Sequence, residues 1–308
     1  MEILAILVCV LVLILLLPLL FFFFFPARVF TMALNAMRKK AGLIQKEMEI
    51  EDGITYAYLD GGEGETLILI HGFGGNKDQF LNIAPALTSR YRLILIDLPG
   101  FGESSRTKGI SYTPKDQARW LEAFTQKLGI HSFHLGGNSM GGQISLFYAA
   151  AHPEKVKSLW LLAPAGLWDG PLSAAGELIM QGKKAPLLVK SEKDFEELMA
   201  FILEKPFPMP KAFMRILARQ RMENFELEKG IARDMVSQNV REAIQGLETP
   251  ALLVFGTKDR MVNPKTGEEM QKLMPAAKVS LLEDVGHVPM LEVPQQIVAD
   301  FLRFQENQ

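Results

Sequence analysis

The stretch FHLGGNSMGGQISLFYAA, residues 133–150, has the pattern of a buried strand, a sharp turn and the start of a helix. The turn reads GNSMG, residues 137–141, and matches G-x-S-x-G, in which a serine sits between a strand and a helix. A residue in such a turn has a strained backbone, and small neighbours leave room for it. The stretch therefore predicts that Ser139 is a nucleophile at the end of a strand.

The sequence around this stretch alternates apolar strands with helices. Because the strands are apolar along their whole length, we expect helices on both faces of a mostly parallel sheet, with a hairpin at its start. The predicted strands are residues 47–52, 54–60, 66–72, 92–100, 133–138, 156–164, 251–259 and 277–284, and the predicted helices are 113–130, 140–155 and 294–304.

Residues 166–247 interrupt the alternation. They contain no clear buried strand, have a helical pattern and are rich in Met and Phe. An insertion at this point lies over the carboxyl ends of the strands, where α/β sheets place their ligand crevice. We therefore predict a helical cap or lid at 166–247 and a core formed by 46–165 and 248–308.

The N-terminus predicts a membrane anchor over residues 1–27. No side chain from Ile3 to Ala27 is charged. As a helix, this stretch is long enough to cross a hydrocarbon core of about 30 Å. A cleaved signal peptide is disfavoured because no Lys or Arg precedes the run, the run is too long and no small-residue cleavage site follows.

Residues 28–45 are predicted to be an amphipathic juxtamembrane segment. Phe30, Leu34 and Met37 recur at helical spacing, and the charges are Arg28, Arg38, Lys39 and Lys40. A helix lying near anionic headgroups is one interpretation, and a solvated linker is the other.

Composition excludes several functions. The chain has 308 residues and a formal net charge of −2. It has no basic stripe, so the sequence does not predict a nucleic acid partner. Cys9 is the single cysteine, so intrachain disulfides are impossible. Its place inside the apolar run disfavours a thiolate metal site and cysteine catalysis.

A serine nucleophile needs a base, and the predicted base is His287. His287 lies in DVGHVPMLE, between the last strand and the last helix, from where a side chain can reach back over the sheet. The other four histidines have structural interpretations: His71 begins the HGFGG loop, His131 and His134 flank a strand, and His152 ends a helix.

The predicted acid that orients the base is Asp259, just past a buried strand. Asp284 is nearer to His287 in sequence, but sequence proximity does not orient an imidazole. Asp97 ends an earlier strand and is predicted to fix a loop.

An oxyanion hole needs two backbone N–H donors, for which we predict Met140 and Phe73. Met140 follows the nucleophile, and Phe73 lies in the glycine-rich HGFGG loop, which can bend toward a substrate. The predicted substrate-binding residues are Gly72, Pro164, Leu167 and Met290.

Together, HGFGG, DLPGFGES, GNSMGG, FGTKD and VGHVPMLE resemble the α/β-hydrolase superfamily over residues 46–308. The resemblance implies a serine hydrolase with the triad and oxyanion roles given above, in the family's chain order Ser139, Asp259, His287. It also implies no metal and no organic cofactor.

The GNSMGGQ and APAGL segments, the cap and the anchor look like membrane-bound monoacylglycerol lipases and single-span bacterial phospholipases A and lysophospholipases. This narrower resemblance implies a membrane-anchored esterase or lipase that hydrolyses carboxylic esters of glycerolipids. Apolar cap residues then either line an acyl pocket or form the cap's own core: Phe195, Leu198, Met199, Phe201, Ile202, Phe213, Met214 and Leu217.

Two alternatives stay open. Hydrolases of carbon–carbon bonds also carry GNSMGG, but they usually have tryptophan where Val288 follows His287 here; a small-ester esterase belongs with this alternative. A catalytically silent, membrane-anchored binding protein is disfavoured because no triad residue is missing.

The side of the membrane and the oligomeric state are also open. Positive charge after the single span predicts a cytoplasmic catalytic domain, whereas the resemblance to the bacterial phospholipases places it outside the cytoplasm. A homodimer through the apolar segment is compatible with the sequence.

Overall fold

The computed structural model describes residues 1–308 except 5–6, 8–15, 18–19, 52 and 207. Its centre is an eight-stranded sheet in the order β1-β2-β4-β3-β5-β6-β7-β8. β1 and β2 form an antiparallel hairpin, β2 is antiparallel to β4, and the other neighbours are parallel, which confirms the predicted sheet. The strands are β1 (Ile44–Glu49), β2 (Thr55–Gly61), β3 (Glu65–Ile70), β4 (Tyr91–Ile96), β5 (Phe133–Asn138), β6 (Val156–Leu162), β7 (Ala251–Gly256) and β8 (Ala277–Leu282).

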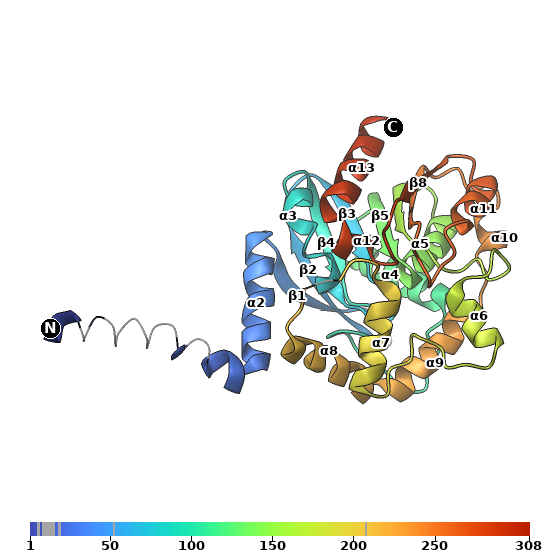
Figure 1. Ribbon diagram of the computed structural model, residues 1–308. Coiled ribbons are helices and arrows are strands. Elements are labelled where there is room, and N and C mark those ends of the chain that lie inside the picture. Colours follow the sequence, from blue (N-terminus) through green and yellow to red (C-terminus); the bar gives the residue numbers. More distant parts are fainter. Residues whose placement is uncertain (5–6, 8–15, 18–19, 52, 207) are drawn as a thin grey trace.

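Helices cover both faces of this sheet, and a second group of helices gathers at one end of the molecule (Figure 1). Those that precede or cover the sheet are α2 (Pro26–Lys40), η1 (Lys77–Phe80), α3 (Ala84–Leu87), α4 (Pro114–Lys127), α5 (Met140–Ala151), α11 (Thr266–Leu273), α12 (Pro289–Glu292) and α13 (Pro294–Glu306). Between β6 and β7 lie α6 (Ala174–Met180), α7 (Glu192–Ile202), α8 (Lys211–Glu223), α9 (Phe225–Val236) and α10 (Arg241–Ile244).

Alternate residues of the central strands build two separate hydrophobic cores. In β3, Ile68 and Ile70 join the core under α4 and α5, whereas Leu67 and Leu69 join the core under α3 and α13. All four are buried. Because both faces are covered, polar residues have no place in the middle of the strand, which explains the continuous apolar run.

The order of the strands reverses at β3. From β3 the chain crosses to β4 on one side, and it later returns to β5 on the other side. Because β3 and β5 are neighbours, the loops after them begin side by side at the carboxyl edge of the sheet, where doubly wound sheets bind their ligands. This topology brings the HGFGG loop and Ser139 together.

The helices between β6 and β7 have a small core of their own. Val189, Phe195, Leu198 and Ala218 are buried in it, and Met199, Ile202, Met214 and Leu217 pack against them. For six of the eight apolar cap residues singled out in the sequence, the structure thus favours the cap-core interpretation over an acyl pocket. The other two lie at its margins: the Phe213 ring contacts Phe30, and Phe201 lies under the Arg260 guanidinium.

No described helix is both long enough and apolar enough to cross a membrane. Of the predicted anchor at 1–27, residues 5–6, 8–15 and 18–19 lie outside the described residues.

The apolar stripe of α2 faces the protein. Leu34 and Met37 pack against the core under α3 and α13, and the Phe30 ring lies 5.0 Å from that of Phe213 on α8. The stripe therefore contacts protein, and a position of the helix near anionic headgroups stays a prediction. The exposed large apolar side chains of this region are instead Phe21, Phe23, Phe24, Phe25 and Met32.

We expect the packing of α13 on the sheet to contribute strongly to stability. The Phe301 ring is fully buried and stacks on Trp160 of β6, with ring centroids 4.3 Å apart. Phe301→Ala should lower the free energy of unfolding by about 3–5 kcal/mol, measured by urea denaturation, because it leaves a large cavity. Arg303→Ala, on the exposed side of the same helix, is the control and should change it by less than about 0.5 kcal/mol. Equal losses in both variants would contradict this account.

Candidate active site

Ser139 occupies a strained turn between β5 and α5. Its φ is 54° and its ψ is −113°, a region that non-glycine residues rarely adopt. Its N–H donates to Leu162 O at 3.0 Å, and its carbonyl accepts from Ala165 N at 3.0 Å. Both partners belong to the end of β6 or the loop after it, so the neighbouring strand holds the turn in place.

Two glycines of the motif are required by close backbone approaches. A Cβ on Gly141 would lie 2.2 Å from Ile70 O at the end of β3. A Cβ on Gly137 would lie 2.4 Å from the carbonyl carbon of Gly141. These contacts let α5 start against the end of β3, which places Ser139 next to the HGFGG loop.

His287 and Asp259 form a buried pair. His287 Nδ1 lies 2.8 Å from Asp259 Oδ2, and the Asp259 side chain is fully buried. The other carboxylate oxygen accepts from Met261 N at 2.7 Å and Val262 N at 3.0 Å. Asp259 therefore keeps a fixed orientation. It occupies Nδ1 of His287, so Nε2 is the ring nitrogen that is not bound to Asp259.

The two other candidate acids have different partners. Asp284 has an exposed side chain 3.7 Å from the Lys258 ammonium, away from the imidazole. Asp97 is fully buried and accepts from Lys77 N at 2.6 Å and Glu103 N at 2.8 Å. Its contacts agree with the expectation that Asp97 fixes a loop.

Asn138 joins the nucleophile turn to the histidine loop, a connection that the sequence analysis missed. Its Nδ2 donates to Leu162 O at 2.9 Å and to His287 O at 3.1 Å. Its Oδ1 accepts from Gln79 Nε2 at 2.9 Å, and the N–H of Gly72 lies 3.4 Å from Gln79 Oε1. Asn138 occupies the first variable position of G-x-S-x-G. Its place in the motif is the only signal in the sequence that could have indicated this role.

The HGFGG loop is covered by an ion pair of the cap. The Phe73 ring lies 5.5 Å from the Arg221 guanidinium and 5.5 Å, edge-on, from Phe101. Arg221 Nε donates to both Glu228 oxygens at 2.9 and 2.8 Å, and both side chains are buried. A Cβ on Gly74 would lie 2.1 Å from Arg221 Cζ, so this glycine lets the guanidinium rest on the loop.

The histidine loop is held by the cap as well. His287 N donates to Ile202 O, at the end of α7, at 2.8 Å. One Glu292 oxygen accepts from Gly286 N at 2.9 Å, and the other accepts from Glu204 N at 3.0 Å and Lys205 N at 2.8 Å. The cap thus contacts both the loop after β3 and the loop after β8.

Three of the predicted oxyanion and substrate residues, Met140, Gly72 and Pro164, lie close to Ser139. Met140 is the first residue of α5, and a Cβ on Gly72 would lie 3.4 Å from Ser139 Cβ. A Cβ on Gly142 would meet Pro164 at 2.8 Å, which places Pro164 on the first turn of α5. Met290 is fully buried, with its sulfur 3.8 Å from Gln79 Nε2.

Leu167 is buried in the core under α4 and α5, the same cluster that contains Phe73 and Met140, and its role in substrate binding stays a prediction. Among the residues that the structure describes, no group of three His, Cys, Asp or Glu side chains is arranged to hold a metal ion.

Two of the remaining histidines are buried in polar networks. His71 Nε2 accepts from Leu98 N at 3.0 Å, so Nδ1 carries the proton and donates to Gly72 O at 2.7 Å. His134 lies between Ser158 Oγ, 2.8 Å from its Nδ1, and Glu65 Oε2, 2.9 Å from its Nε2. His131 is exposed, and His152 ends α5 as predicted.

Comparison with known proteins places these features in a family. The sequence profile described as "alpha/beta hydrolase fold" matches residues 65–294. Lipase 1 of Psychrobacter immobilis is 41% identical over 276 residues, covering 87% of this chain and 86% of that protein. Human monoacylglycerol lipase ABHD6 is 26% identical and covers 80% of this chain and 77% of its own. The crystal structure of a membrane phospholipase A, described as a bacterial virulence factor, matches with a TM-score of 0.88 at 33% identity, over 98% of both chains.

Burial lowers the pKa of His71 and of His134 below the ordinary value of about 6.5. The unfolded chain therefore binds protons at a higher pH than the folded chain does, and stability should fall as the pH drops below about 6.5. We expect urea unfolding of the wild type to give a smaller free energy at pH 5.5 than at pH 7.5, and His71→Gln should reduce that difference.

His131→Gln, at an exposed position, is the control and should leave the difference unchanged. Equal wild-type free energies at the two pH values would contradict the assignment of His71 and His134 as neutral in the folded protein.

Proposed function

The chain belongs to the α/β-hydrolase family, and on that premise we propose that it is a membrane-associated lipase in which Ser139, His287 and Asp259 cleave glycerolipid esters. The observation that carries the proposal is the buried His287–Asp259 pair, tied through Asn138 to the strained turn of Ser139.

The reaction type follows from the relatives. The chain is a carboxylic ester hydrolase, like the bacterial lipase that it matches over most of both chains. The substrate class is our proposal. It rests on what the similar proteins are named for: a lipase, a monoacylglycerol lipase and a membrane phospholipase A.

In the proposed first half-reaction, Ser139 attacks the ester carbonyl. Its proton passes to Nε2 of His287, since Nδ1 is bonded to Asp259. The N–H groups of Phe73 and Met140 donate to the oxygen that becomes negative, and α5, which starts at Met140, directs the positive end of its dipole there. The C–O bond then breaks, and the leaving alcohol takes the proton from His287.

In the second half-reaction, water attacks the acyl group on Ser139. His287 removes a proton from this water and returns it to the Ser139 oxygen as the fatty acid leaves. Asp259 remains ionised and keeps the imidazole in place through both steps. The overall products are one alcohol and one fatty acid, and the protein ends unchanged.

The membrane association is proposed from the N-terminal sequence. Residues 3–27 carry no charge, and a cluster of exposed phenylalanines comes immediately before α2. A tether holds the catalytic domain near an insoluble substrate and raises its effective concentration. Lys39 and Lys40, exposed at the end of α2, add positive charge that anionic headgroups attract.

Ser139→Ala should lower kcat by about 10⁴–10⁶-fold, because it removes the group that forms the acyl-enzyme. The measurement is fatty acid release from a monoacylglycerol, a lysophospholipid and a diacyl phospholipid by the detergent-solubilised protein. The ranking of the three rates names the substrate class.

Ser145→Ala is the matched control. This serine lies on α5, and its hydroxyl donates only to Gly141 O at 2.8 Å, so wild-type rates are expected. Activity that survives in Ser139→Ala would overturn the proposed nucleophile. Activity on short soluble esters alone would favour the small-ester alternative, and cleavage of a carbon–carbon bond would favour the runner-up class.

A second test addresses the anchor. The full chain in native membranes should stay in the pellet after washing with sodium carbonate at high pH. High pH removes the charge of lysines and so weakens electrostatic attachment, whereas an apolar helix remains in the bilayer. Release by this wash, or by 1 M salt, would show that the association is peripheral and that residues 1–27 do not span the membrane.

A further inference from the structure

The turn η1 connects three parts of the protein through three consecutive side chains. Lys77 is buried and donates a hydrogen bond to Asp97. Asp78 accepts one from Arg38 of α2, and Gln79 donates one to Asn138, next to the proposed nucleophile. η1 begins at Lys77, two residues after the HGFGG loop, so the position of η1 fixes the C-terminal end of that loop.

The inward contact is a buried ion pair. Lys77 Nζ lies 2.8 Å from Asp97 Oδ2, and the two side chains are 2% and 0% exposed. Burial on its own lowers the pKa of Lys77, but the charge and hydrogen bond of Asp97, together with Glu103 and Asp78, outweigh burial and raise the pKa. Because an unpaired charge at this depth is costly, the start of η1 has little freedom to move.

The contact toward the catalytic residues runs through Gln79. Its Nε2 donates to Asn138 Oδ1 at 2.9 Å, and Asn138 in turn holds the carbonyl of His287 at 3.1 Å. Its Oε1 faces both Gly72 N, at 3.4 Å, and the position that a Cβ on Gly75 would occupy. A displacement of η1 therefore reaches the HGFGG loop and the nucleophile turn together.

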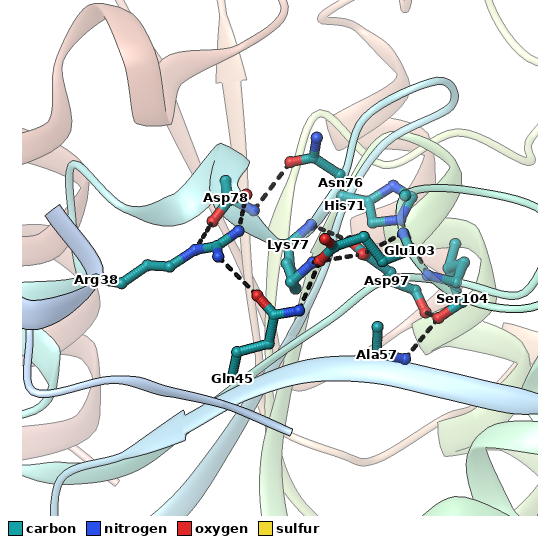
Figure 2. A network of polar contacts seen from close by, with 12 residues as sticks. Arg38, Gln45, Ala57, His71, Asn76, Lys77, Asp78, Asp97, Glu103 and Ser104 are labelled. Atoms are coloured by element: carbon teal, nitrogen blue, oxygen red, sulfur yellow. Dashed lines mark hydrogen bonds and ion pairs between the residues drawn. The ribbon is translucent and has the colours of Figure 1, made fainter. Parts of the chain in front are cut away.

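The outward contact closes a ring with α2 (Figure 2). Arg38 donates to both oxygens of Asp78, Nε to Oδ1 at 2.7 Å and Nη2 to Oδ2 at 2.6 Å. Arg38 Nη1 donates to Gln45 Oε1 at 2.6 Å, and Gln45 Nε2 donates to Glu103 Oε2 at 2.9 Å. Glu103 is also paired with Lys77 Nζ, so the ring returns to η1.

We propose that Arg38 and Asp78 are positioning residues for catalysis: their two-point ion pair fixes η1 against α2, and through η1 it fixes the HGFGG loop and Asn138. This inference rests on the proposed function, because it assumes that the HGFGG loop supplies an oxyanion donor.

The geometry suits such a role. Both side chains are largely buried, 12% and 9% exposed, and a planar guanidinium on a carboxylate restricts orientation as well as distance. α2 itself is anchored by Leu34 and Met37 on the core, so it offers η1 a fixed support. A donor shifted by a fraction of an ångström stabilises the transition state less while the substrate still binds.

The test uses the detergent-solubilised full chain and a soluble short-chain ester, so that membrane attachment does not enter the rate. We expect Arg38→Ala and Asp78→Asn each to lower kcat about tenfold with KM changed by less than about twofold. The double variant should be no slower than either single variant, since both remove the same contact. The charge-swapped pair Arg38→Asp with Asp78→Arg should recover part of the lost kcat.

Arg119→Ala is the matched control, because Arg119 of α4 pairs with Glu51, between β1 and β2, outside this network. It should keep the wild-type kcat. Unchanged kcat in both single variants, losses that multiply in the double variant, or an equal loss in Arg119→Ala would each overturn the proposal. A melting temperature measured for every variant identifies any loss of the folded state. Asp78→Asn keeps the side-chain shape and is the variant in which we least expect such a loss.

The two proposals fail in different ways. If Ser139→Ala keeps its activity, the proposed function is wrong, whatever the Arg38 variants do. If Ser139→Ala is inactive while the Arg38 and Asp78 variants match the wild type, the catalytic assignment stands and the positioning role alone is wrong.

Discussion

The strained backbone of Ser139 is the constraint on which the rest of the site depends. A non-glycine residue at φ 54° and ψ −113° costs about 1–3 kcal/mol and persists only where its surroundings hold it. Here the surroundings are the end of β6, which accepts from Ser139 N, and the end of β3, which lies so close to α5 that only glycine fits at 141. The parallel sheet therefore does more than support the site, because its edge determines the conformation of the nucleophile.

The cap is bound to the same edge at two points. Arg221 rests on Phe73 and Gly74, and Ile202 accepts from the backbone of His287. The first contact depends on a buried ion pair with Glu228, and removing one partner of such a pair leaves an uncompensated charge. A cap that opened as a rigid body would have to release both loops, so motion of the cap and the geometry of the proposed oxyanion hole are linked.

Much of this architecture could be predicted from the sequence, because it depends on local pattern. The apolar runs at 66–72 and 92–100 predict covered strands, and glycines around Ser139 predict the turn. What could not be predicted depends on contacts between distant segments. The apolar stripe of α2 was compatible with lipid or protein, and only the fold shows Leu34 on the core. Asn138, Gln79 and Glu292 are ordinary polar residues in sequence, and their importance comes from the loops that they join.

Apart from the proposed catalytic residues, the protein brings a serine, a histidine and a carboxylate into contact: Ser158, His134 and Glu65. Ser158 is 1% exposed, and it lies on β6 shortly after α5 ends, whereas Ser139 stands where α5 begins. The Ser158 side chain points to the face of the sheet that α13 covers, where Gln305 Nε2 donates to its hydroxyl at 2.7 Å, so it does not face α5. The amide pole of α5, at Ser139, favours an alkoxide. The same three residue types can therefore form a packed polar contact inside a sheet or, as we propose for Ser139, His287 and Asp259, a reactive site at its edge. The position in the fold decides between the two.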